Sequence, residues 1–379
     1  MTADNMRFGF GRNWADFIDA HFSEERIQEA QDHLLRFLEL PDLRGKTFLD
    51  IGCGSGLHSL AAIRAGAARV QSFDYDPDSV RTTQKLREFA GNPDYWEVTQ
   101  GSVLDREFVE RLEPADIVYS WGVLHHTGQM WQAIENAARP LADDGVFYIA
   151  LYTTDVYLDP TPEYWMRVKR EYNLAGPMRK RLMEWRHAWR VTILPDLRNG
   201  RNPFKSIREY AVFRGMSYWT DVKDWLGGYP MEFAGIQETK DFCRDRLGLE
   251  LLNICAGEAN TEYLLRKRNA VNYWDEVTAG RTVQTLRRPF ARRAGHAWNA
   301  KIPEHTATAD DTTDPQRSRM MLFEDGMPVG FAHQTHSAIE QHGGGRYSHW
   351  QDSLVFSATD NSDPNTNGRT YAVSPDVLP

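Results

Sequence analysis

The residues with the clearest chemical potential are three glycines at alternate positions, where an apolar stretch ends. Segment 48–56 reads FLDIGCGSG, and its glycines Gly52, Gly54 and Gly56 directly precede a stretch of helical character. Glycine lets the backbone approach a bound ligand closely at a sharp strand-to-helix turn. We therefore predict a ligand-binding turn here, which also contains Ser55. A tight turn without a ligand is the alternative for the glycines alone.

Other glycine-rich motifs fit this segment less well. A dinucleotide-binding G-x-G-x-x-G motif would need glycine where Leu57 stands, and no G-K-[ST] follows as in a phosphate-binding loop. The hydrolase motif G-x-S-x-G fails because Cys53 and Leu57 lie two residues from Ser55. The spacing therefore argues against these three kinds of site.

An acidic residue ends the next apolar stretch, ARVQSFDYD at 68–76. A carboxylate at the end of this second strand can accept hydrogen bonds from two ribose hydroxyls of a nucleoside that lies across the strand ends. Asp74 and Asp76 both compete for this role. We favour Asp74, because Tyr75 can then pack on the base while Asp76 begins the following turn.

Two consecutive histidines, His125 and His126, follow the fourth predicted strand in the loop that faces the ligand. An imidazole titrates near physiological pH, so either residue is a candidate general base. The alternative for each histidine is that it caps the following helix or packs in the core.

Alternating strands and helices are expected to position these residues, in an α/β fold with a parallel sheet. We predict five strands and three helices in the first part of the chain: strands at 46–52, 68–76, 95–102, 115–122 and 145–152, and helices at 24–40, 57–65 and 130–139. A turn is expected at 143–145. Residues 153–235 interrupt this alternation and predict a helical cap. A helix at 238–247 and a hairpin of the strands LELLNIC and TEYLLRK follow.

The motifs FLDIGCGSG, SFDYD, GSVLD and DIVYSWGVLHHTGQMWQAIENAARPLADDG resemble the successive motifs of class I S-adenosylmethionine-dependent methyltransferases, over about residues 40–268. The resemblance implies a Rossmann-like sheet of seven strands, the last antiparallel. It also implies S-adenosylmethionine as the cofactor and S-adenosylhomocysteine as its product. Many members carry an acid where Ser102 stands, so the adenine amino group would here meet backbone or Asp105.

By this resemblance, the cofactor contacts lie at the ends of the first four strands and in an N-terminal lid. The implied cofactor-binding residues are Asp50, Gly52, Gly54, Ser55, Gly56, Asp74, Tyr75, Ser102, Val103, Trp121 and Trp14. Asp50 would orient the glycine turn or meet an ammonium group through water.

The sequence divides into four predicted parts. Residues 1–40 form an N-terminal helical lid segment, and residues 41–268 form the methyltransferase domain with its insertion at about 153–235. Residues 269–318 contain a basic helix, with Arg281, Arg287, Arg288, Arg292 and Arg293, and a polar linker. Residues 319–379 form a small β-rich C-terminal domain.

Composition excludes several classes of protein. The 379 residues carry 44 Lys and Arg against 53 Asp and Glu, a net charge of -9 that disfavours nucleic acid as a partner. Three separated cysteines without a C-x-x-C pair suggest neither a disulfide framework nor a zinc site, and the pair His333 and His336 lacks a full metal-binding pattern. We expect no metal, no membrane span, no signal peptide and a cytoplasmic location.

The insertion suggests the acceptor. It is rich in aromatic residues and carries a basic set: Arg167, Lys169, Arg170, Arg179, Lys180 and Arg181. Aromatic rings suit a sugar or another ring-bearing acceptor, and the cations suit a phosphate or carboxylate, although a small core and a solvated helix face explain them equally well. We predict O-methylation of a sugar or glycan-related hydroxyl (EC 2.1.1.-). The alternatives are a secondary metabolite as acceptor, or a glycan-binding protein that acts mainly through its C-terminal domain; the sequence leaves the oligomeric state open.

Overall fold

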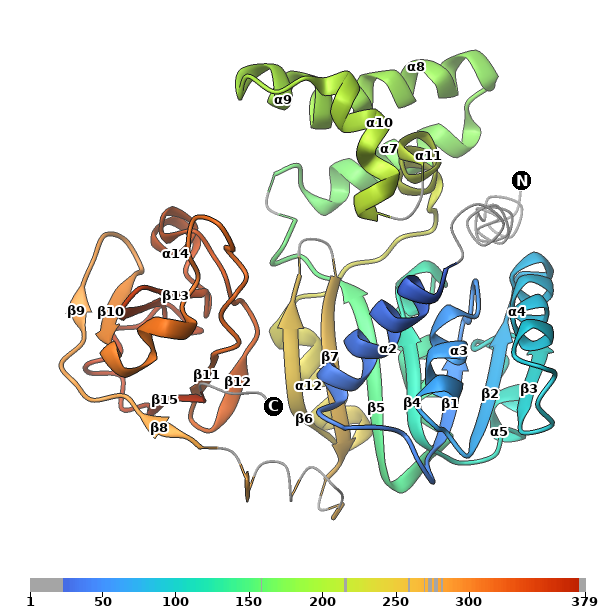
Figure 1. The fold of residues 1–379 in the computed structure, drawn as a ribbon, viewed down its shortest axis with the longest axis horizontal. Helices are drawn as coiled ribbons and strands as arrows, with labels where there is room; N and C mark the ends of the chain where they lie inside the picture. The colour runs from blue at the N-terminus through green and yellow to red at the C-terminus, as the bar shows by residue number, and fades with distance from the viewer. Residues whose placement is uncertain are drawn as a thin grey trace. The chain divides into compact units, whose positions relative to one another are not determined.

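The computed structural model describes residues 23–374 except 158, 215–216, 258–259, 269, 272–274, 276–278 and 281. Seven strands form one sheet in the order β3-β2-β1-β4-β5-β7-β6 (Figure 1). They are β1 (Thr47–Ile51), β2 (Arg69–Asp74), β3 (Trp96–Gln100), β4 (Ala115–Trp121), β5 (Leu141–Tyr152), β6 (Leu249–Ala256) and β7 (Asn260–Lys267). β1 pairs in parallel with β2 and β4, whereas β6 and β7 pair antiparallel. The predicted Rossmann-like α/β sheet is confirmed.

Four predicted helices are confirmed: α2 (Glu24–Leu38), α3 (Leu57–Arg64), α6 (Met130–Ala137) and α12 (Ile236–Leu247). Two further helices, α4 (Pro77–Phe89) and α5 (Arg106–Glu110), follow β2 and β3. Capping explains where two of them begin. Asp76 accepts a hydrogen bond from the Asp78 amide at the start of α4, and Asp105 accepts one from the Phe108 amide at the start of α5. Gly248, at φ 68°, follows the end of α12.

The turn predicted at 143–145 is wrong, because β5 runs without interruption through these residues. Asp143 and Asp144 lie in its exposed first part, and Asp143 accepts a hydrogen bond from the Lys267 ammonium at 2.8 Å. Acidic residues followed by glycine favour a turn locally. Here the strand's pairing within the sheet outweighs that local preference.

The insertion is helical, as predicted. Its elements are α7 (Pro162–Leu174), α8 (Pro177–Ala188), the π-helical turn η3 (Trp189–Ile193), α9 (Leu194–Arg198), α10 (Pro203–Arg214) and α11 (Tyr218–Gly227). These elements share a small core that includes Trp165, Tyr172, Met183, Tyr218 and Leu226. Further aromatic residues of the insertion pack against this core: Tyr157, Tyr164, Tyr210, Trp219 and Trp225.

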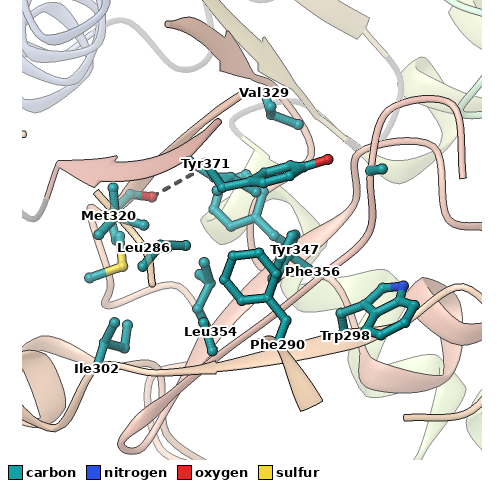
Figure 2. Packing of buried hydrophobic residues seen from close by; sticks show 14 residues of the cluster. Leu286, Phe290, Trp298, Ile302, Met320, Val329, Tyr347, Leu354, Phe356 and Tyr371 are labelled. Carbon is teal, nitrogen blue, oxygen red and sulfur yellow. Dashed lines mark hydrogen bonds between the residues drawn. The ribbon is translucent and has the colours of Figure 1, made fainter. Parts of the chain in front are cut away.

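Beyond β7 the chain forms two four-stranded sheets, ordered β13-β14-β10-β9 and β12-β11-β15-β8. Their strands are β8 (Gln284–Thr285), β9 (Ala291–Arg292), β10 (Trp298–Lys301), β11 (Met321–Glu324), β12 (Met327–Val329), β13 (Tyr347–Trp350), β14 (Ser353–Phe356) and β15 (Tyr371–Ser374). Figure 2 shows their shared core, in which Phe290 lies edge-on to Phe356. At one side of this core, the Tyr347 hydroxyl donates a hydrogen bond to the Met320 carbonyl at 3.1 Å.

The basic helix predicted before this domain is wrong for its described part. Residues 284–292 contain β8 and β9, and the buried side chains of Leu286 and Phe290 join the β-domain core. The polar run 303–318, expected to be a linker, contains the 3-10 helix η4 (Pro303–Thr308) and buries Asp310 and Ser318. These segments therefore pack into the β-rich region despite their polar composition. The predicted domain boundaries remain predictions.

Strand β6, at the edge of the seven-stranded sheet, is partly covered by the β-rich region. The Ala256 amide donates to the Gly330 carbonyl at 2.8 Å, directly after β12. An uncovered sheet edge would present unpaired backbone groups to other chains. The β-rich region thus protects this edge. Among the described helices, none is both long and apolar enough to cross a bilayer.

Candidate cofactor and acceptor site

The glycine turn after β1 is built from left-handed backbone. Gly52, Gly54 and Gly56 have φ values of 75°, 54° and 80°, which other residues rarely adopt. Backbone hydrogen bonds hold the turn: the Gly52 and Cys53 amides both donate to the Phe73 carbonyl, at 2.8 and 3.1 Å. The turn is therefore anchored to the end of β2.

Close packing also demands glycine in this turn. A Cβ added at Gly52 would lie 2.4 Å from the Val123 side chain, and one at Gly56 would lie 2.8 Å from Thr83. The Thr83 hydroxyl donates to the Gly54 carbonyl at 3.3 Å, which ties α4 to the turn. Ser55 is buried, and its hydroxyl accepts a hydrogen bond from the Leu57 amide at the start of α3.

Asp74 faces this turn from the end of β2. One carboxylate oxygen accepts from the Gly54 amide at 2.9 Å, and the other accepts from the Asp76 amide at 2.8 Å. A carboxylate offers about four acceptor positions, so acceptor capacity is left for ribose hydroxyls. Burial raises the pKa of Asp74 to about 6, and the backbone hydrogen bonds oppose that rise.

Asp50 lies inside the fold rather than at the surface of the site. Its carboxylate accepts a hydrogen bond from Ser59 of α3, whose hydroxyl lies 2.8 Å from that of Ser72 in β2. The Trp96 indole of β3 donates to the same Ser72 hydroxyl at 2.9 Å. Burial raises the pKa of Asp50 to about 7, with the Ser59 hydrogen bond acting against it. Asp50 therefore joins β1 to α3 and fixes the turn between them; its contact with cofactor remains a prediction.

The remaining predicted contacts follow the ends of β2, β3 and β4. Tyr75 and Trp121 are exposed, Ser102 is half-buried, and Val103 is buried. The Ser102 hydroxyl accepts from the Leu104 amide at 3.2 Å. Because the carboxyl ends of parallel strands share one edge of a sheet, the fold brings these residues to the same side as the glycine turn. Trp14 and the rest of the expected lid before residue 23 lie outside the described residues.

The structure distinguishes the two histidines, which lie in the 3-10 helix η2 (Leu124–His126) after β4. His126 Nδ1 lies 2.7 Å from the Pro230 carbonyl oxygen, which can only accept, so the ring proton is on Nδ1 and the lone pair is on Nε2. Burial lowers the pKa of His126 to about 4, and the Pro230 hydrogen bond opposes that shift. His126 is therefore a neutral, oriented imidazole.

His125 is fully buried, with its ring centroid 4.2 Å from that of Tyr152 and 4.4 Å from that of His126. Within the described part of the chain, neither of its ring nitrogens has a hydrogen-bond partner. Burial holds its pKa well below the usual value. His125 is thus a core residue that supports His126, which leaves His126 as the better candidate base.

A lysine of the insertion is buried near the two histidines. Lys169 of α7 donates a hydrogen bond to the Trp225 carbonyl, and its ammonium lies 4.0 Å from the centroid of the Trp225 ring. Burial lowers the pKa of Lys169 to about 7, and its charge in turn lowers the pKa of His126. Of the two explanations left open for the basic set, a solvated helix face therefore does not hold for Lys169. Its place four residues after the buried Trp165 is the helical spacing that could have shown this.

The insertion encloses a cavity of about 240 Å³. Its lining combines aromatic, apolar and basic side chains, among them Tyr164, Trp165, Arg186, His187 and Arg190. The Arg190 guanidinium donates to the Tyr164 hydroxyl at 3.1 Å and lies 5.6 Å from the centroid of its ring. Sequence reasoning did not single out Arg186, His187 or Arg190 as neighbours, because only the packing of α7 against α8 brings them to one cavity.

A family model described as "Methyltransferase domain" matches residues 22–212, about half of the chain. The chain belongs to this methyltransferase family. S-adenosylmethionine is its cofactor, as the sequence motifs predicted. The match spans the glycine turn, Asp74, both histidines and most of the insertion.

Curated relatives of the methyltransferase are similar over part of their length. The ribosomal protein L11 methyltransferase of Vibrio parahaemolyticus serotype O3:K6 is 30% identical over 142 residues, which cover 35% of this chain and 48% of the relative. That of Alteromonas mediterranea is 47% identical over 51 residues, 14% and 18% of the two chains. The match to the Vibrio relative spans about half of that relative's length.

Solved structures are similar to this chain at low identity. Magnesium protoporphyrin IX methyltransferase from Synechocystis PCC 6803 with bound SAH has a TM-score of 0.40 and 13% identity, covering 70% of this chain and 97% of that one. PKMT2 from Rickettsia typhi in complex with AdoHcy has a TM-score of 0.44 and 16% identity, covering 62% and 52%.

The residues of the methyltransferase fit its cofactor. The left-handed glycines leave the turn without side chains where a ligand approaches, and Asp74 keeps acceptor capacity beside it. Asp74 would hold the ribose, and the turn would lie along the amino-acid portion. Among the described residues, no group of three or more His, Cys, Asp or Glu side chains could hold a metal ion. His333 instead lies with its Nδ1 2.8 Å from the buried carboxylate of Asp310.

Proposed function

We propose that the methyltransferase methylates a hydroxyl group on a sugar or glycan-related small molecule. The observation that carries this proposal is the orientation of His126, a neutral imidazole whose lone pair is on Nε2. When bound, S-adenosylmethionine supplies an electrophilic methyl group. A hydroxyl acceptor must lose its proton as it attacks, so it needs a base at that point.

His126 meets the requirements of such a base. The Pro230 carbonyl fixes its tautomer, and burial keeps its pKa at about 4, so the ring is neutral at physiological pH. Its position after β4 places it at the sheet edge that carries the glycine turn. A base this weak contributes by accepting the proton during transfer, while positioning of the two reactants supplies much of the rate.

The cavity of the insertion supports a ring-bearing, anionic acceptor. Its volume of about 240 Å³ lies just below the range of roughly 300–1,000 Å³ that is common for ligand pockets, which suits a single sugar ring. Tyr164 and Trp165 offer aromatic faces for that ring. Arg186 and Arg190 would select a phosphate or carboxylate on it, as in a nucleotide-linked or acidic sugar.

The proposed setting is the cytoplasm. Cys53, Cys243 and Cys255 are all free thiols, which suits a reducing compartment. A soluble, phosphate-bearing sugar would be available there as an acceptor.

A direct assay tests the proposal. The full chain is incubated with S-adenosylmethionine and, separately, with neutral sugars, nucleotide-linked sugars, phenolic secondary metabolites and purified ribosomal protein L11, and release of S-adenosylhomocysteine is measured. NMR of the product then identifies the methylated atom. We expect turnover with an anionic sugar and a methyl group on oxygen. Methylation of nitrogen, of a metabolite without a sugar, or of ribosomal protein L11 would overturn the assignment.

A further inference from the structure

Helix α8 and the turn η3 carry a stripe of exposed apolar side chains. Met178, Leu182, Trp185 and Trp189 are 88%, 69%, 54% and 54% exposed. Their spacing of four, three and four residues places them on one face of a helix. The opposite face of α8 buries Met183, Glu184 and Ala188 in the insertion. The apolar stripe therefore lies on the exposed side of α8, where Trp185 also packs against Trp219 of α11, with 4.8 Å between their ring centroids.

Basic side chains border this stripe. Arg179 follows it on one side and Arg181 on the other, as the helical period dictates, and both are exposed. Arg179 also lies 3.6 Å from Glu171 of α7. The one acidic residue of α8, Glu184, is buried and accepts a hydrogen bond from the Tyr172 hydroxyl at 2.7 Å. The exposed surface of α8 is therefore cationic and apolar, on a chain with a net charge of -9.

We infer that the stripe of Met178, Leu182, Trp185 and Trp189 docks on the surface of an anionic lipid bilayer. Amphipathic helices with tryptophan and leucine on one face and arginine beside them lie in the membrane interface, where the apolar side chains enter the acyl boundary. The arginines can meanwhile reach lipid phosphates with their extended side chains. This function goes beyond methyl transfer, because it would hold the enzyme at a membrane surface.

Charge favours a lipid surface over a second copy of the chain. Two copies that paired through this stripe would bring the arginines of both helices together, and like charges repel. An anionic bilayer instead attracts each basic side chain near its surface by about 1 kcal/mol, about fivefold in affinity. The same arrangement predicts that binding weakens as salt rises.

Vesicle sedimentation of the full chain tests this inference. The probes are vesicles of phosphatidylcholine alone and of phosphatidylcholine mixed with phosphatidylglycerol, at low and high salt. We expect sedimentation with the mixed vesicles only. Trp185→Ser with Trp189→Ser should weaken it at least tenfold, and Arg179→Gln with Arg181→Gln should weaken it by about fivefold per charge.

Matched controls are Phe89→Ser, an exposed apolar residue on α4, and Arg106→Gln with Arg111→Gln, two exposed cations on and after α5. These variants should sediment like the wild type, and all variants should keep their affinity for S-adenosylmethionine by calorimetry. Equal sedimentation with both kinds of vesicle, or none, would overturn the inference. A dimer in light scattering that Trp185→Ser with Trp189→Ser dissociates would also overturn it, because the stripe would then serve self-association.

Discussion

The glycine turn and the helical insertion are held in shape by different physical means. In the turn, backbone conformation and backbone hydrogen bonds fix the structure, as the two amides on the Phe73 carbonyl show. In the insertion, side chains fix it: Trp165 and Trp225 lie 5.0 Å apart between ring centroids, and Trp225 also covers the Lys169 ammonium. A site made of backbone needs particular residues at fixed spacing, whereas a site made of packed side chains tolerates many solutions.

The two regions also bury ionisable groups of opposite type, carboxyls around the turn and an amine in the insertion. Burial raises the pKa of Asp50 to about 7 and of Asp74 to about 6 around the turn, and it lowers the pKa of Lys169 to about 7 in the insertion. Each shift favours the neutral form, as desolvation requires. Protonation of Asp74 at low pH therefore removes hydrogen-bond acceptor capacity beside the glycine turn, whereas loss of the Lys169 proton at high pH favours the folded insertion.

The largest expected effect concerns His126, the proposed base. His126→Ala should slow turnover on a hydroxyl acceptor by about 10²–10⁴-fold, because the proton then has no positioned acceptor. Affinity for S-adenosylmethionine should not change, since His126 lies outside the glycine turn. Release of S-adenosylhomocysteine measures the rate. The buried neighbour His125 supplies the comparison: His125→Asn should cost activity less than His126→Ala. Wild-type turnover in both variants would show that neither imidazole is the base.

The second-largest expected effect tests whether Asp74, beside the glycine turn, binds the cofactor. Asp74→Ala should weaken cofactor binding by about 1–3 kcal/mol, roughly 5- to 150-fold, through loss of charge-assisted hydrogen bonds to ribose. Isothermal titration calorimetry measures the affinity. Asp76→Ala is the matched control, because it removes a carboxylate that caps α4 and should cost about 1 kcal/mol of stability instead. If Asp76→Ala weakens cofactor binding more than Asp74→Ala does, the rival carboxylate holds the ribose.

Low pH should weaken binding of the cofactor at the glycine turn. The pKa of Asp74 is raised to about 6, so its carboxylate is ionised above that pH and becomes protonated as pH falls through it. A protonated carboxyl offers fewer acceptor positions, so cofactor affinity should fall by about tenfold from pH 7 to pH 5. Calorimetry across this range measures it. Asp74→Asn should flatten the pH profile, and an unchanged profile in that variant would assign the titration to another group.

The smallest expected effect belongs to the insertion. Folding lowers the pKa of Lys169 from 10.5 to about 7, so between these values the unfolded chain binds more protons and stability rises with pH. The melting temperature of wild type should therefore rise by a few degrees relative to Lys169→Met between about pH 7 and 9. Lys180→Met removes a less buried lysine of the same insertion and should leave that rise in place. If the melting temperature of the wild type rises with pH no more than that of Lys169→Met, Lys169 is not desolvated.

Prediction from sequence succeeded where local rules and the fold agree. The glycine turn, Asp74 and the order of strands and helices follow from spacing and alternation, and the structure contains them at the expected positions. It failed where packing overrode a local preference. The ADDG segment has the composition of a turn, but it forms part of β5. The basic stretch after residue 281 was predicted to be a helix, but it contributes strands to two sheets.

The sequence by itself determined the glycine turn and the strand-ending Asp74, because positive φ favours glycine and the alternation of strands and helices sets where the strand ends. Only the tertiary structure decided that His126 is oriented while His125 is buried, and that Lys169 lies against Trp225 rather than in solvent. These differences arise from contacts between residues far apart in the chain, such as His126 with Pro230. Such contacts depend on how whole elements pack, which no local spacing encodes.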